Sequence, residues 1–354
     1  LAVDGNPQIS RFLMEFVQTE IVDIVDNKIS GAQWDVNLRS FIATAQGIVE
    51  STDLSVHPVA QYWWNGTGTY LDSPQVKDGA SWDSPNFSGS VAWSSSGTDN
   101  TNNYVTSSYD ATWVAAGGGS WYYSASDGSL YAVTQSFDTR SEKDLKVGVK
   151  TIVKKWYSGS LSGLAPSASF ENYGFIVKWE DSVEFSEDTQ IQPVMQFYSV
   201  DTNTIYPPQL EFKWKDFSNV LTGSLTSSIV DTTNLVSSLA ENPGEFFPSS
   251  INRFRLNVAP KYPVRTFQTA SLFTGTNFLP TASYYAVKDL DTNEFVINYD
   301  TTYTQLSSDG DGNYFDIYMN GLEPERYYKI LIKTNIGGST LILDDNYYFK
   351  VING

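Results

Sequence analysis

The stretch from residue 144 to residue 179 constrains the fold of this chain more than any other. The apolar residues of its first half begin with the period of two that is typical of a strand and then shift phase, which predicts a strand passing into a turn or a short helix. These residues are Leu145, Val147, Val149, Ile152, Val153 and Trp156. Residues 174–179 form a second β-branched and aromatic run, so we expect another strand there. The simplest interpretation is a β-sandwich core with lysines on its solvated face.

The chain as a whole is rich in aromatic residues and poor in charge. Its 354 residues are 15% aromatic and 18% charged, a balance that favours β-sheets with large contact surfaces over a disordered chain. This length leaves room for two domains, each with a full core. We therefore expect an all-β protein of two β-sandwich domains.

The charge and the cysteine count exclude several kinds of partner and site. The net charge is -18, and because neutralising a phosphate backbone needs clustered Lys and Arg, we expect no nucleic-acid partner. Cysteine is absent, which excludes thiol nucleophiles, disulfides and Cys-based metal sites. No stretch approaches the apolar length of a membrane span, so we expect no membrane partner. The chain starts at Leu1 without a visible secretion signal, so we expect either that the chain was processed or that an upstream part is absent from this sequence.

Strand and turn signals divide the chain into three segments. Residues 1–216 carry short strand-like runs and are expected to form the first sandwich, although a short helix competes with a strand at residues 15–29. Residues 217–250 are rich in Ser, Thr and Asn and are expected to be a linker. Residues 251–354 show closely spaced short strands, which predict an immunoglobulin-like sandwich.

Turn residues in the last segment sharpen this expectation. Residues 289–293 and 335–338 have the composition of hairpin loops. Residues 322–328 have the Leu-x-Pro-x-x-x-Tyr spacing of the corner in fibronectin type III domains, where a tyrosine hydroxyl bonds back to the backbone. The spacing predicts a tyrosine corner made by Tyr328.

No set of residues has the pattern of an enzyme's active site. The one histidine, His57, lies on an expected strand without the Gly-x-Ser-x-Gly turn of a serine hydrolase, so we expect it to be packed. Residues 309–313 imitate the start of a calcium loop, but Tyr314 and Asn320 stand where that loop needs Gly and Glu. A hairpin turn is therefore expected there. We predict no catalytic residue, no cofactor and no located metal site.

Residues 65–128 differ in texture from the rest, because Trp and Tyr are scattered among many Gly, Ser and Asn residues. Flat aromatic rings with polar neighbours are typical of sugar-binding surfaces. The candidate ligand-binding or interface residues here are Trp64, Trp82, Trp113, Trp121 and Tyr122, and Trp93 and Tyr123 share their character. The simpler interpretation is that these rings pack the loops onto the sandwich or against a neighbouring subunit.

Several of these pieces, taken in order, resemble the DNRLRE-type carbohydrate-binding module, a β-sandwich family. The pieces are residues 11–16, 54–68, 78–82, 144–156 and 172–177. The resemblance covers the first domain and implies a jelly-roll-like sandwich.

A second resemblance is to virion structural proteins of contractile-tailed phages, especially those of marine cyanobacteria. It is carried by residues 198–214, 254–258, 262–268 and 279–293 and by the Tyr328 corner. It implies a virion component of the tail, baseplate, neck or head surface, with other virion proteins and copies of itself as partners. We expect residues 65–128 to be ordered largely by neighbouring chains, because permanent interfaces bury much aromatic surface. The alternative is a glycan-binding adhesin whose aromatic rings bind host-surface polysaccharide.

Overall fold

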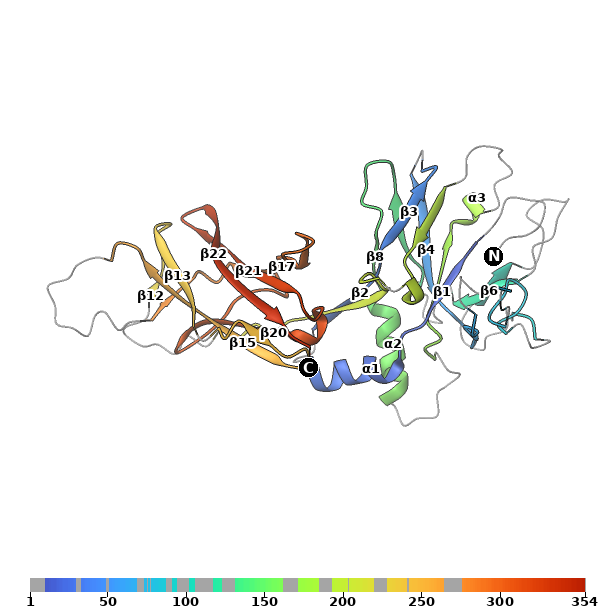
Figure 1. Cartoon of the computed structure of the whole chain (residues 1–354), viewed down its shortest axis with the longest axis horizontal. Coiled ribbons are helices and arrows are strands. Elements are labelled where there is room, and N and C mark those ends of the chain that lie inside the picture. Colours follow the sequence, from blue (N-terminus) through green and yellow to red (C-terminus); the bar gives the residue numbers. More distant parts are fainter. Residues whose placement is uncertain are drawn as a thin grey trace. The chain divides into compact units, whose positions relative to one another are not determined.

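The computed structural model (Figure 1) consists of two compact units, which we call the N-terminal unit and the C-terminal unit. The N-terminal unit comprises residues 1–29 and 34–213, and the C-terminal unit comprises residues 30–33 and 214–354. The structure describes residues 10–29, 33–48, 51–68, 73–74, 76, 78–86, 91–93, 102–105, 117–122, 131–161, 171–184, 193–202, 204–219, 228–240, 242–263 and 276–353.

The expected all-β class is confirmed, since strands dominate both units and pair mostly antiparallel. Helices are few and short. In the N-terminal unit they are α1 (Gln18–Asp23), which continues as a π-helix (Ile24–Lys28), α2 (Lys150–Leu161), α3 (Asp181–Glu184) and a 3-10 turn (Val200–Thr202). The C-terminal unit has a 3-10 turn (Met319–Gly321).

The N-terminal unit is built from two larger sheets and two strand pairs (Figure 1). Its strands are β1 (Phe12–Met14), β2 (Trp34–Ser40), β3 (Ile42–Gln46), β4 (Thr52–Pro58), β5 (Asn102–Val105), β6 (Gly117–Tyr122), β7 (Val133–Phe137), β8 (Leu145–Gly148), β9 (Phe175–Trp179), β10 (Val194–Phe197) and β11 (Gln209–Trp214). The sheets have the orders β1-β9-β4-β7 and β11-β2-β8, and the pairs are β10-β3 and β5-β6.

The stretch 144–179 folds as its pattern predicts. β8 buries Leu145 and Val147 and exposes the residues between them, and α2 begins where the apolar period changes. Trp156 of α2 is buried against Phe175 of β9, with 4.8 Å between the ring centroids. β9 is hydrogen-bonded on both edges, between β1 and β4, and it is covered on both faces, because its consecutive residues Phe175 to Lys178 are all buried. At residues 15–29 the helix, and not the strand, is correct, since α1 and its π-helical extension occupy that stretch.

The C-terminal unit has two larger sheets that face one core, and a separate pair of short parallel strands, β12 and β16 (Figure 1). Its strands are β12 (Ser228–Ile229), β13 (Leu235–Ala240), β14 (Glu245–Phe246), β15 (Ile251–Pro260), β16 (Asn277–Phe278), β17 (Ser283–Asp289), β18 (Phe295–Ile297), β19 (Ser307–Asp309), β20 (Gly312–Tyr318), β21 (Tyr327–Ile336) and β22 (Ser339–Val351). One sheet has the order β13-β15-β20-β19 and the other β14-β22-β21-β17-β18. Phe254 and Phe315 of the first sheet and Tyr285, Tyr328 and Phe349 of the second share the core.

The segment 217–250 differs from the linker that its composition suggests. β13 pairs with β15 along its whole length, from Leu235 opposite Pro260 to Ala240 opposite Arg255. β14 pairs with the end of β22. This segment therefore contributes edge strands to the C-terminal unit, because Leu235 and Leu239 lie on one face of β13 and pack against its core.

The predicted turns are present in the C-terminal unit. Residues 289–293 join β17 to β18, and Gly337 and Gly338, both with positive φ, join β21 to β22. Residues 310–311 form the tight turn between β19 and β20, as expected in place of a calcium loop. The tyrosine corner is also confirmed. Tyr328 is buried, and its hydroxyl donates a 3.0 Å hydrogen bond to the carbonyl oxygen of Glu323.

Candidate recognition site

The aromatic residues that the sequence indicates as candidates for ligand binding or an interface divide into a buried and an exposed group. Trp82, Trp121 and Tyr122 are buried in the N-terminal unit, and Trp93 joins them. Trp64 is 43% exposed. Trp113 and Tyr123 lie outside the described residues. Packing onto the chain's own sandwich therefore accounts for the buried rings, and Trp64 alone of the described candidates presents a large open face.

A buried ionic cluster holds the aromatic segment to the sandwich. Arg11, next to β1, donates to both carboxylate oxygens of Glu184 in α3, from Nε at 3.0 Å and from Nη2 at 2.6 Å. Its Nη1 donates to the carbonyl of Gly118 in β6 at 2.7 Å. The guanidinium also lies over the rings of Trp82 and Trp121, at 4.9 Å and 5.1 Å from the centroids. Arg11 thus ties together four segments that are distant in the sequence.

Lys178 of β9 completes this cluster. Its ammonium nitrogen is 3.6 Å from the Glu184 carboxylate, and both side chains are almost fully buried. The same nitrogen donates to the carbonyl of Trp179 at 2.8 Å. Since one buried carboxylate faces two buried cations, Glu184 is the group on which the cluster depends.

Glycine is required where β6 passes this cluster. Gly118 has φ of +82°, and a Cβ there would lie 2.5 Å from Nη1 of Arg11 and 2.9 Å from the Trp82 ring. Gly119 has φ of +106°, and its Cβ would lie 2.5 Å from Ile176. Gly118 and Gly119, which read from the sequence as loop material, therefore lie on a strand that approaches its neighbours too closely for side chains.

A recess of about 180 Å³ opens beside the cluster. We call it the Trp64 pocket. Three indoles, from Trp63, Trp64 and Trp93, line it together with Asn65 and Ser81. Two of these indoles are fixed by their ring nitrogens. Trp63 donates to the carbonyl of Tyr173 at 2.8 Å, and Trp93 donates to the carbonyl of Ser81 at 3.0 Å.

The other residues that the sequence singles out for chemistry include His57. His57 is buried on β4, with its ring 5.9 Å from that of Trp121, so it is packed as expected. Among the residues that the structure describes, no three His, Cys, Asp or Glu side chains gather as a metal site. In the same part of the chain, no helix is long and apolar enough to cross a membrane.

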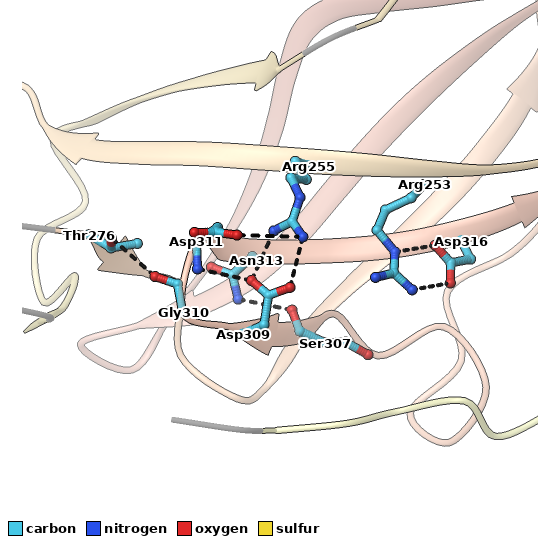
Figure 2. A network of polar contacts seen from close by, with 9 residues as sticks. All are labelled: Arg253, Arg255, Thr276, Ser307, Asp309, Gly310, Asp311, Asn313 and Asp316. Atoms are coloured by element: carbon cyan, nitrogen blue, oxygen red, sulfur yellow. Dashed lines mark hydrogen bonds and ion pairs between the residues drawn. The ribbon is translucent and has the colours of Figure 1, made fainter. Parts of the chain in front are cut away.

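A polar ladder runs over one sheet of the C-terminal unit (Figure 2). Arg253 bonds both oxygens of Asp316 at 2.9 Å, and Arg255 bonds both oxygens of Asp309 at 2.8 Å. Both guanidiniums lie over the ring of Tyr314 between them, at 4.1 Å and 5.6 Å. The Arg255 guanidinium holds the pKa of Asp309 below its ordinary value. Arg253 pairs with Asp316 on the neighbouring strand β20, and Arg255 reaches over β20 to Asp309 on β19. Because both carboxylates are paired with arginine, the ladder stabilises the sheet rather than supplying a reactive acid.

Asp216 lies near this ladder, but its pKa is shifted upward, in the direction opposite to that of Asp309. Burial, and after it the negative charge of Asp316, raises the pKa of Asp216 to about 6. Trp214, two residues before Asp216, packs edge-on against Tyr318, with 4.6 Å between the ring centroids. Asp216 is therefore a carboxyl group whose charge is costly at neutral pH.

The outer face of the other sheet carries lysines that lie on aromatic rings. We call this surface, formed by β17, β18, β21 and β22, the lysine–aromatic face. Its pairs are Lys288 with Phe295, Lys329 with Tyr348, Lys333 with Tyr284 and Tyr299, and Lys350 with Tyr327, all within 6 Å. In these strands the residues adjacent in sequence to the lysines and rings point into the core. The lysines and rings therefore lie on the outer face of the sheet.

Large apolar side chains of the lysine–aromatic face remain in solvent. These residues are each 39% to 54% exposed: Leu290, Phe295, Tyr327, Ile342 and Tyr348. Two of the lysines are also ion-paired, Lys329 with Asp344 at 2.6 Å and Lys350 with Glu325. Sequence reasoning missed this surface, although the alternation of Lys and Tyr at residues 284–288 and 327–333 is its signal.

Comparison with known proteins identifies no relative. No family model, no curated protein and no solved structure matches this chain.

Proposed function

We propose that this chain is a structural component of a tailed phage particle that acts through assembly with other virion proteins and with copies of itself. The proposal rests on the resemblance of the sequence at residues 198–214, 254–258, 262–268 and 279–293 to virion structural proteins. The lysine–aromatic face is the observation that favours assembly. An immunoglobulin-like arrangement of the C-terminal unit and a jelly-roll-like arrangement of the N-terminal unit are part of the same proposal.

The composition of the lysine–aromatic face suits a protein interface. Tyrosine and other aromatic residues are enriched in interface cores, and large exposed apolar patches are uncommon on proteins that act alone. The lysine ammonium groups lie on ring faces, which restricts the conformations of the lysine side chains. Less side-chain entropy is therefore lost when a partner binds.

The buried aromatic residues of the N-terminal unit support a non-enzymatic role. Trp82, Trp121 and Tyr122 pack within the unit, so they are scaffold residues. This packing limits the expectation that neighbouring chains order residues 65–128. The described β6 part of that segment contacts Arg11 and Ile176 of the same chain, so it does not need a neighbouring chain to order it. Assembly through the C-terminal unit does not need those residues.

Charge substitution on the face tests the proposal. The double variant Tyr327→Glu/Tyr348→Glu adds two negative charges at exposed positions, and Val236→Glu/Ile251→Glu adds the same charge at exposed positions of the other sheet. Sedimentation velocity of the purified chain, and its amount in phage particles assembled with each variant, are the measurements. We expect the first variant to weaken association by about tenfold or more and the control to leave it unchanged. Equal behaviour of the two variants would contradict the proposal.

A further inference from the structure

We propose that the Trp64 pocket binds a small aromatic carboxylic acid in its ionised form, which is a function separate from assembly. The recess lies in the N-terminal unit, whereas the lysine–aromatic face belongs to the C-terminal unit. The charge in the wall, the hydrogen-bond donors that lack acceptors and the aromatic rings each restrict the ligand that the pocket can take.

The charge in the wall of the pocket favours an anion. Arg11 is the only ionisable side chain that lines the recess among the described residues. Its side chain is 1% exposed, and it shares the carboxylate of Glu184 with the ammonium group of Lys178. Since two buried cations face this one carboxylate, and the carboxylate itself does not line the recess, a negative charge placed in the recess would be attracted to Arg11.

Arg11 also has donors that are not used within the chain. A guanidinium group carries five N–H donors. Two of those of Arg11 donate to Glu184 and one donates to the carbonyl of Gly118, which leaves two without an acceptor among the residues that the structure describes. The indole N–H of Trp82, whose ring centroid is 4.9 Å from the guanidinium carbon, is also buried without an acceptor. Because unsatisfied buried donors are costly, this surplus predicts a ligand that accepts hydrogen bonds.

A glycine on β6 leaves the guanidinium next to the recess. Gly118 lines the recess, and a Cβ at this position would lie 2.5 Å from Nη1 of Arg11. Glycine therefore places no side chain between Nη1 and the recess. Carboxylates are the acceptors that match a guanidinium group best, because their two oxygens can accept from two of its N–H groups at once.

The rest of the wall restricts the body of the ligand. Trp63, Trp64 and Trp93 line the recess, and of these Trp63 and Trp93 are buried whereas Trp64 is largely exposed. A flat aromatic ring can stack on an indole, and covering Trp64 would remove apolar surface from water. The recess measures about 180 Å³, which is less than the 300–1,000 Å³ or so of pockets for drug-sized ligands. It therefore admits one ring with its carboxylate.

The pocket is formed before any ligand arrives. The backbone amide of Ala80 donates to the carbonyl of Trp64 at 2.7 Å, and the amide of Trp64 donates to the carbonyl of Pro85 at 2.9 Å. Asp78 accepts hydrogen bonds from both the amide and the hydroxyl of Thr67, which closes the loop that follows Trp64. Little conformational entropy would be lost on binding, so even a few contacts suffice for measurable affinity.

Titration of the full chain with benzoate, benzamide and acetate tests the proposal. Benzamide keeps the ring of benzoate without its charge, and acetate keeps the charge without the ring. Tryptophan fluorescence and ligand-observed NMR report binding. We expect benzoate to bind about tenfold or more tightly than either of the other two compounds, because only benzoate uses both the guanidinium group and the indoles.

Three variants locate the binding site. Trp64→Ala should weaken benzoate binding by about fivefold or more, because it removes one aromatic wall. Tyr62→Ala is the matched control, since Tyr62 is exposed nearby but does not line the recess, and it should leave binding unchanged. Glu184→Gln removes the negative charge beside Arg11 and should tighten benzoate binding by about threefold or more. If Glu184→Gln does not fold, Trp64→Ala and its control still decide the matter.

Three results would overturn the proposal. The first is the absence of benzoate binding at about 10 mM ligand. The second is benzamide binding as tightly as benzoate. The third is benzoate binding that survives Trp64→Ala in a variant whose thermal unfolding matches that of the unsubstituted chain. None of these results would affect assembly, because sedimentation and particle incorporation are measured separately.

Discussion

Removing the carboxylate of Glu184 should unfold the N-terminal unit more readily than any single change on its surface. The substitution Glu184→Gln keeps the shape of the side chain and removes the charge that faces Arg11 and Lys178. Arg11 then keeps its bond to the Gly118 carbonyl and one bond to the amide oxygen of Gln. It loses the other of its two bonds to the carboxylate, which measure 3.0 Å and 2.6 Å, and the negative charge that compensates its own. Lys178 loses its counter-ion at 3.6 Å.

The expected cost follows from the burial of the cluster. The side chains of Arg11 and Glu184 are each 1% exposed, and breaking such a pair from one side costs about 3–5 kcal/mol because a buried charge is left without compensation. Arg11→Met should cost somewhat less, since Lys178 still faces Glu184. The double variant Arg11→Met/Glu184→Gln should cost less than the sum of the single variants by about 2 kcal/mol, because both charges of the pair are then absent.

Equilibrium unfolding in urea, followed by tryptophan fluorescence, measures these free energies. The control is the pair Arg253→Met and Asp316→Asn on the C-terminal unit, where Arg253 is 48% exposed and a loss of about 0–1 kcal/mol is expected. The reasoning is refuted if Glu184→Gln costs no more than Asp316→Asn. It is also refuted if the two substitutions at the buried pair are additive within about 0.5 kcal/mol.

Three further predictions concern single residues. Tyr328→Phe should lower the stability of the C-terminal unit by about 1 kcal/mol in the same urea assay, because it removes the hydrogen bond to Glu323. The pKa of Asp216 is raised from 3.8 to about 6 in the folded chain, so the folded state holds this proton more tightly. The stability that Asp216 contributes therefore falls as pH rises from about 4 to about 6, and Asp216→Asn should reduce that slope when unfolding is measured at several pH values. Gly174→Ala places a Cβ 2.0 Å from the Met14 carbonyl oxygen and should cost well over about 1 kcal/mol, whereas Gly337→Ala, with open space, should cost about that amount.

The sequence predicts those parts of the fold that depend on residues close together in the chain. The alternation of Leu145 and Val147 and the phase change before Ile152 identify β8 and α2, because a strand and a helix differ in period. Gly337 and Gly338 identify a turn because they take positive φ there. The Tyr328 corner is local as well, since its hydroxyl reaches only five residues back.

The parts that sequence reasoning missed depend on contacts between distant residues. Arg11 and Glu184 are 173 residues apart, and neither position carries a pattern that pairs it with the other. The same holds for Trp64 and Trp82, which both lie close to glycine and polar residues in the sequence, although Trp64 is exposed and Trp82 is buried with Arg11 over its ring. Composition also gave the wrong prediction at β13. The many Ser and Thr residues of this segment indicated a linker, although Leu235 and Leu239 lie on one face of a strand.

The most direct test of the proposed function is the position of this chain in an averaged density map of a phage particle that encodes it. We predict symmetry-related copies of the chain in the tail, baseplate, neck or head surface, with Tyr327 and Tyr348 covered by a neighbouring subunit. Absence of the chain from the purified particle, or a map in which the lysine–aromatic face is open to solvent in every copy, would contradict the proposal.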